Sequence, residues 1–120
     1  MSNRKVWVYD LETFSNLFSY TAMNIDTKEV KQFTIWKNKN ELVKLLNHLD
    51  EVKGMIGFNN ISFDCNIIEY IINKKSKFLG YNGDRIARLI YSEAQRIIKL
   101  EWSQVRNPLI YQLDLFKIWH

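Results

Sequence analysis

The fold of this chain is decided by residues 5–12, Lys5-Val6-Trp7-Val8-Tyr9-Asp10-Leu11-Glu12, an apolar run that ends in two acidic residues. Side chains along a strand alternate between its two faces, so Asp10 and Glu12 project side by side from one end of the strand. Two carboxylates packed together repel each other, and a divalent cation removes this conflict. Carboxylate oxygens are hard ligands that suit Mg²⁺, Mn²⁺ or Ca²⁺. The pattern therefore predicts a metal site at the end of the first strand.

A third acidic residue, Asp64, follows an apolar segment flanked by turn residues, Gly54-Met55-Ile56-Gly57-Phe58-Asn59-Asn60. This segment predicts a short buried strand over residues 54–58. In sheets with parallel strands, ligands gather at the carboxyl ends of the strands. If the strand at 54–58 is adjacent and parallel to the first strand, Asp64 converges with Asp10 and Glu12 on one metal site.

The hydrophobic pattern predicts an α/β fold. Strands are expected at residues 5–10, 18–25, 30–36, 54–58 and 109–116, and helices at 41–52, 64–73 and about 84–102. The first strand is expected to be buried on both faces, at Val6 and Val8, and residues 74–77 and 80–83 are expected to be loops. The order of elements favours a mixed five-stranded sheet with an antiparallel three-strand start and helices covering its faces.

Length and composition indicate one globular domain over residues 1–120, because 47% of the residues are hydrophobic. No apolar stretch approaches the roughly 20 residues that span a bilayer, so no membrane partner is expected. The N-terminus has no signal-peptide segment and the single cysteine, Cys65, excludes an internal disulfide framework. Both features favour a cytoplasmic setting. The net charge of +4 favours a polyanionic partner.

Several chemically versatile residues have plain structural interpretations. His48 lies among leucines on the helix at 41–52 and is expected at its surface or boundary, and Cys65 is expected to be a small buried residue. Asp114, on the last strand, is expected to be structural, although it is a possible extra carboxylate of the site. One basic cluster is interpreted as a solvated face, with a phosphate track as the alternative: Lys74, Lys75, Lys77, Arg85 and Arg88.

Two stretches carry a resemblance to a known family. They are Val8-Tyr9-Asp10-Leu11-Glu12-Thr13-Phe14 and Gly57-Phe58-Asn59-Asn60-Ile61-Ser62-Phe63-Asp64. They resemble the first two motifs of the DEDD superfamily of 3′→5′ exonucleases, which are Asp-x-Glu followed by Thr, and Asn-x-x-Phe-Asp after a short strand. The region from Tyr91 to His120 is also similar to phage-type proofreading exonuclease domains. The resemblance thus covers essentially the whole chain.

The resemblance implies a ribonuclease-H-like fold and two-metal hydrolysis that removes nucleotides from the 3′ ends of single-stranded DNA. It implies that Asp10, Glu12 and Asp64 hold Mg²⁺ or Mn²⁺ and are the catalytic residues. The residues that it places at the substrate or directly around the site are Leu11, Thr13, Phe14, Asn60 and Phe63. It also implies a phage or bacterial replication system, and hence a bacterial host cytoplasm.

The chain departs from the family at its end. The family has a fourth carboxylate on a later helix, preceded by a His or Tyr that orients the attacking water. The sequence stops at His120, before such a helix, so the exonuclease domain is interpreted as C-terminally incomplete, without the last helices. Three functions stay open: an exonuclease, a catalytically incomplete homologue that binds nucleic acid or a protein, and the N-terminal piece of a longer enzyme. A polymerase or a second chain could complete the fold.

Overall fold

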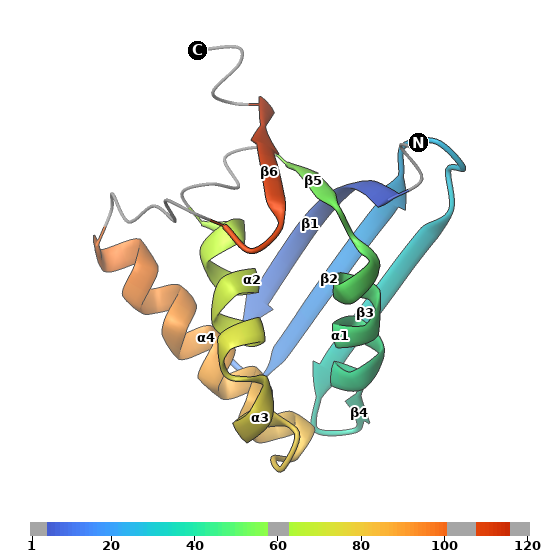
Figure 1. The fold of residues 1–120 in the computed structure, drawn as a ribbon. Coiled ribbons are helices and arrows are strands. Elements are labelled where there is room, and N and C mark those ends of the chain that lie inside the picture. The colour runs from blue at the N-terminus through green and yellow to red at the C-terminus, as the bar shows by residue number, and fades with distance from the viewer. Residues whose placement is uncertain (1–4, 58–62, 101–107, 116–120) are drawn as a thin grey trace.

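The computed structural model describes residues 5–57, 63–100 and 108–115, which form a mixed sheet with helices packed on it (Figure 1). The strands are β1 (Val6–Phe14), β2 (Leu17–Asn24), β3 (Val30–Trp36), β4 (Lys39–Asn40), β5 (Gly54–Gly57) and β6 (Tyr111–Asp114). The helices are α1 (Leu42–Glu51), α2 (Asp64–Asn73), α3 (Lys75–Phe78) and α4 (Gly83–Leu100). The α/β class predicted from the sequence is confirmed. None of the described helices combines the length and the apolar character needed to cross a membrane.

The sheet has the strand order β4-β3-β2-β1-β5-β6. β1 pairs antiparallel with β2 and parallel with β5, and β5 pairs parallel with β6. The first strand and the strand predicted at 54–58 are therefore neighbours with their carboxyl ends on the same edge. The expectation of five strands is wrong, because Lys39–Asn40 turns back on β3 and adds the two-residue strand β4.

Two local expectations also need correction. β1 continues beyond residue 10 to Phe14, because its ladder with β2 runs on to the pair Phe14 and Leu17 beside the turn. The expected loop at 74–77 is mostly the short helix α3, because Phe78 is buried against the rings of Tyr70 and Tyr81 and holds this segment in place.

The two faces of β1 have different surroundings. Trp7, Tyr9 and Leu11 are buried, whereas Val8 is 36% exposed and Val6 is half-buried. The expectation that Val6 and Val8 bury both faces is therefore wrong. The physical reason is visible in Figure 1, where the described helices α1, α2 and α4 all lie on one side of the sheet. The opposite side, called here the open face, carries the side chains at the even-numbered positions of β1.

Apolar stripes hold α1 and α4 on the covered face. Leu42, Leu45 and Leu49 are buried on α1, and α4 packs across β1, β2 and β3 through a stripe that includes Ile86 and Ile90. α4 begins at Gly83, directly against the backbone carbonyl of Trp36, where a β-carbon would collide with that oxygen. The start of α4 and the turn after β3 are thus in close contact.

His48 lies inside the core, not at the surface or boundary of its helix as expected. It is 3% exposed, its Nε2 is 2.8 Å from the hydroxyl oxygen of Tyr20, and the edge of Trp7 packs against its ring at 4.7 Å. Burial, helped by the charge of Lys31, lowers the pKa of His48 to about 4. The side chain is therefore neutral in the native state at physiological pH.

This neutral histidine predicts a loss of stability in mild acid. Between pH 6.5 and about 4 the unfolded chain binds a proton at His48 that the native state does not, so the contribution of His48 to the free energy of unfolding falls as pH falls. The loss should reach about 3 kcal/mol, and His48→Gln, which keeps a partner for Tyr20 but does not titrate, should remove it. Urea unfolding of both proteins from pH 7 to 4 measures the difference. Parallel curves for the two proteins would contradict the prediction.

Candidate metal centre

Asp10 and Glu12 lie on the open face of β1, where both are exposed. Their partners in register on β2 are Thr21 and Ser19, which are small hydroxyl residues that leave the carboxylates uncovered. The apolar side chains of β1 that alternate with them face the helices. Because successive side chains of a strand point to opposite faces, both acids point away from the helices. The sequence therefore places two carboxylates side by side on an accessible surface, as predicted.

Asp64 is the first residue of α2 and follows the carboxyl end of β5. Its pKa is raised to about 7 by partial burial and then by the nearby charges of Asp10 and Asp114. Asp64 is therefore within electrostatic reach of two other carboxylates, one on each of the strands β1 and β6. Glu12 is not among the charges that raise this pKa.

Asp114 has a closer relation to the site than the sequence alone indicated. It ends β6, is 2% exposed, and lies in register with Gly57, the last residue of β5. The carboxyl ends of β5 and β6 lie at the same end of the sheet, and β1 runs parallel beside β5. Asp10 is in the middle of β1, whereas Asp64 and Asp114 lie just after β5 and at the end of β6. The sequence had offered Asp114 as a possible extra carboxylate, and the parallel pairing of β6 with β5 brings it beside the end of β5.

The donor chemistry of this edge fits a divalent cation. All of its acidic groups are hard oxygen donors, and the partly buried Asp64 carries repulsion that a cation would relieve. In the described residues, however, no three His, Cys, Asp or Glu side chains come close enough together to hold an ion between them. The carboxylates of Asp10 and Asp114 are within electrostatic reach of Asp64.

The remaining predicted residues fall in three places. Leu11 is buried among the core residues, opposite to Asp10, so any contact with a substrate would come from its main chain. Thr13 and Phe63 are half-buried, and Phe63 packs against the core. Phe14 is 52% exposed on the same side of β1 as the carboxylates. Asn60 lies outside the described residues.

The open face around Asp10 is apolar and slightly hollowed. A shallow depression of about 250 Å³ is lined by Asp10 and Thr21 together with Val8, Met23 and Val30. Val30 is 62% exposed, and Val8 and Met23 are each more than a third exposed. Apolar side chains with this exposure beside charged ones are typical of a surface that contacts a ligand or another chain.

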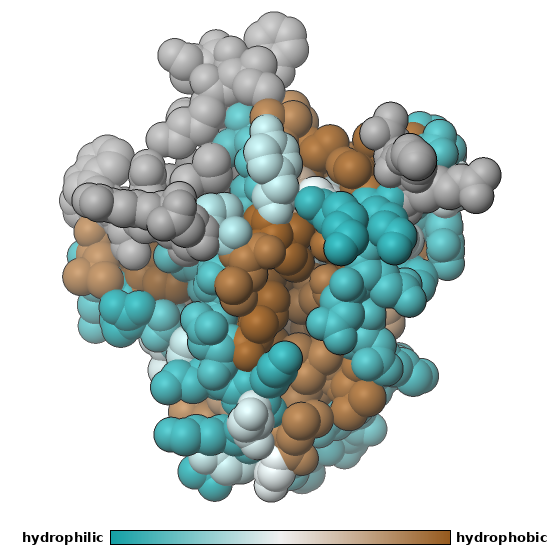
Figure 2. Space-filling model, viewed as in Figure 1, coloured by the Kyte–Doolittle hydropathy of each residue, from teal (hydrophilic) through white to brown (hydrophobic). Residues whose placement is uncertain are grey.

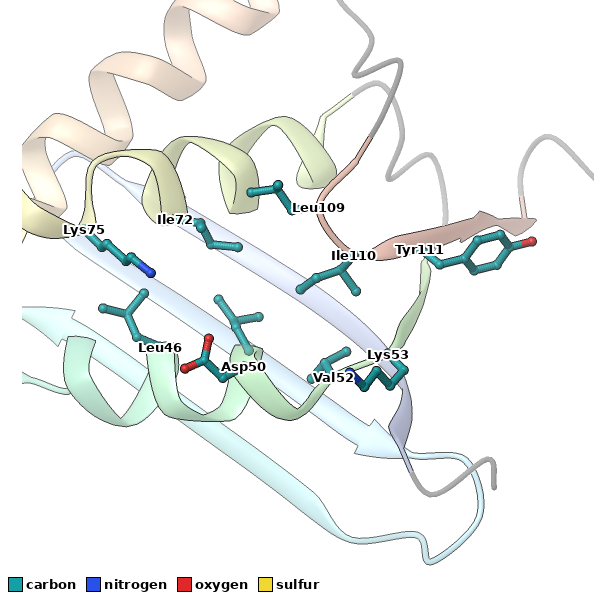
Figure 3. A pocket seen from close by; sticks show the side chains of 10 residues that line it. Leu46, Asp50, Val52, Lys53, Ile72, Lys75, Leu109, Ile110 and Tyr111 are labelled. Atoms are coloured by element: carbon teal, nitrogen blue, oxygen red, sulfur yellow. The ribbon is translucent and has the colours of Figure 1, made fainter. Parts of the chain in front are cut away.

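A separate groove lies on the helix-covered side, between α1 and α2 (Figure 3). It measures about 370 Å³, and in Figure 3 Leu46 and Ile72 face each other across it while Asp50 and Lys75 lie at its rim. Figure 2 shows an apolar strip along this groove, flanked by polar side chains. None of the predicted catalytic carboxylates lines it, so it is distinct from the candidate metal centre.

Comparisons with known proteins do not assign the chain to a family. No family model matches it, and no curated protein matches it significantly.

Proposed function

We propose that this chain forms the metal-binding part of a 3′→5′ exonuclease of the DEDD type that acts on DNA 3′ ends. The observation that supports the proposal is the raised pKa of Asp64, caused first by burial and then by the nearby charges of Asp10 and Asp114, which lie on β1 and β6 on the two sides of the parallel strand β5. The strand order, antiparallel on one side of β1 and parallel on the other, supports a ribonuclease-H-like fold.

In this proposal Asp10 and Asp64 hold Mg²⁺ or Mn²⁺, and Glu12 and Asp114 supply the further carboxylates. The bound ions would stabilise the charge on the attacking and leaving oxygens of the phosphodiester. Phe14, exposed on the same side as Asp10, is placed to stack against a terminal base. Ser19 and Thr21 lie opposite the two acids on β2 and supply small hydroxyl side chains beside them.

The proposal is tested with a labelled single-stranded oligonucleotide in the presence of Mg²⁺ or Mn²⁺. We expect stepwise shortening of the oligonucleotide from its 3′ end. This shortening should be absent with EDTA, and an oligonucleotide whose 3′ end is blocked should not be shortened. Shortening from the 5′ end or internal cuts would contradict the assigned polarity. No cleavage with either ion would refute the exonuclease function for this chain.

A second candidate function is a binding module that does not cleave. It is favoured by two observations, the absence of a closed group of three metal ligands among the described residues and the exposed apolar side chains around Asp10. Such a module would bind a nucleic acid or a protein through the open face. It predicts that the oligonucleotide is retained by the chain and stays intact when Mn²⁺ is added.

A further inference from the structure

A group of exposed cations lies at one end of the molecule, where α3, the start of α4 and the turn between β3 and β4 meet (Figure 1). This basic end consists of Lys37, Lys74, Lys77, Arg85 and Arg88, all of them exposed. The close contact between Gly83 and Trp36 brings these segments together, although they are far apart in the sequence. The basic end is therefore a product of the fold and not a single run of charges.

The basic end is strongly positive. Its five cations are accompanied by one acid, Asp84, so this group carries a net charge of +4. Lys39, which follows on β4, is already paired with Glu41 at 3.7 Å. A field this concentrated attracts a polyanion to one particular end of the molecule.

Both arginines of the basic end are held in place by neighbours. The guanidinium of Arg85 lies over the ring of Tyr81 at 3.8 Å, and Nε of Arg88 donates to the carboxylate of Asp84 at 2.9 Å. The backbone N–H of Arg85 donates to the side chain of Asn82 at 2.8 Å, which fixes the start of α4. Arginines that are already ordered lose less conformational entropy when they bind a phosphate.

A polar hollow connects the two sides of the basic end. It measures about 400 Å³ and is lined by Lys37, Asn82, Asp84 and Arg88. Two cations from separate segments thus face one space that is large enough for a phosphate group and its water. The ring of Tyr81, in contrast, is covered by Arg85 and offers no open face on that side for base stacking.

We infer that the basic end binds the phosphate backbone of a nucleic-acid duplex, without sequence preference. Lysines and arginines that contact phosphates position a duplex but read no bases. A single strand would need stacking platforms, and the aromatic ring at this end is occupied by a guanidinium. α2 has ten residues, so its far end at Asp64 is about 15 Å from Lys74. This surface is distinct from the candidate metal centre, and the inference does not depend on cleavage.

The test compares two triple variants with the same net charge. The first, Lys37→Gln with Lys77→Gln and Arg85→Gln, removes cations from the basic end. The control, Lys5→Gln with Lys53→Gln and Lys99→Gln, removes exposed cations elsewhere. Binding of a fluorescent 20-base-pair DNA duplex, and of one of its strands alone, is followed by anisotropy at several salt concentrations in EDTA, so that no cleavage occurs. Circular dichroism verifies that each variant is folded.

The basic-end variant is expected to bind at least about tenfold more weakly at low salt, and its salt slope should fall by about 2 to 3. The control variant is expected to stay within about threefold of the unmodified chain. The inference would be overturned if the two variants weakened duplex binding equally or if the unmodified chain did not bind the duplex. It would also be overturned if loss of the basic end weakened single-stranded binding more than duplex binding. Because EDTA prevents cleavage, failure here is separate from failure of the proposed exonuclease function.

Discussion

Asp10→Asn is expected to lower the rate of 3′-end cleavage by about 10² to 10³-fold. Asparagine keeps the size and one oxygen of the side chain but removes the negative charge that holds a divalent ion. Metal ions contribute several kcal/mol of transition-state stabilisation in such reactions, and each 1.36 kcal/mol corresponds to a tenfold change in rate. Asp10 is exposed on the open face, so the exchange should leave the fold intact. The rate is measured with the 3′-labelled oligonucleotide at saturating Mn²⁺.

The matched control is Glu29→Gln, an exposed acid in the connection between β2 and β3 that faces none of the candidate ligands. It removes one negative charge as well, and its rate should equal that of the unmodified chain. Calorimetric titration with Mn²⁺ should show that Asp10→Asn loses ion binding while the control retains it. An Asp10→Asn protein that cleaves as fast as the unmodified chain would remove Asp10 from the reaction.

Asp64→Asn is expected to stabilise the ion-free protein above pH 7 by about 2 to 4 kcal/mol. The pKa of Asp64 is raised to about 7 by burial, Asp10 and Asp114, so ionising it costs free energy in the native state. Between the unfolded pKa near 4 and the native pKa, the native state binds the extra proton. The contribution of Asp64 to the stability of the unmodified chain therefore falls as pH rises through this window, and the asparagine variant lacks this contribution. Urea unfolding in EDTA from pH 4 to 8 measures the effect.

Adding Mg²⁺ should make the unmodified chain more stable than Asp64→Asn. An ion that binds only the native state stabilises it in proportion to its occupancy, and the unmodified chain keeps the charge that binds it. The stability of Asp64→Asn should therefore increase little when Mg²⁺ is added. The unmodified chain should become more stable and lose, above pH 5, the part of its pH dependence that Asp64 causes. If the variant is less stable than the unmodified chain at pH 8 in EDTA, the repulsion at Asp64 does not exist.

The regular elements were predictable because their patterns are local. The helix at 64–73 and the strand at 30–36 match α2 and β3, since each has apolar residues at the spacing of its own secondary structure. β4 and α3 were not predictable from local pattern, because a two-residue strand and a single helical turn depend on tertiary contacts. For α3 the decisive contact is made by Phe78 with Tyr70 and Tyr81.

Burial was harder to predict than secondary structure. Val6 and Val8 have the same apolar character as core residues, and only the one-sided placement of the helices exposes Val8. His48 is a polar residue on a helix of leucines, and it stays buried because Tyr20 and Trp7 supply enclosed partners for its ring. These contacts join residues that are distant in sequence, so no local pattern encodes them.

The candidate site was partly predictable. The spacing of Asp10 and Glu12 fixed their common face, and the position of Asp64 after a strand fixed its edge of the sheet. The proximity of Asp114 depends on which strand lies next to β5, a property of topology that the sequence order of strands does not determine. The contribution of Asn60 remains a prediction from its motif.

The continuous ladder between β1 and β2 has a consequence for engineering. Its register runs from Trp7 with Asn24 to Phe14 with Leu17, so Asp10 and Glu12 both lie within it. A substitution that weakens this ladder should displace the two carboxylates together, relative to Asp64 at the start of α2. β2 is thus the part of the described fold through which the spacing between these two acids and Asp64 can be adjusted.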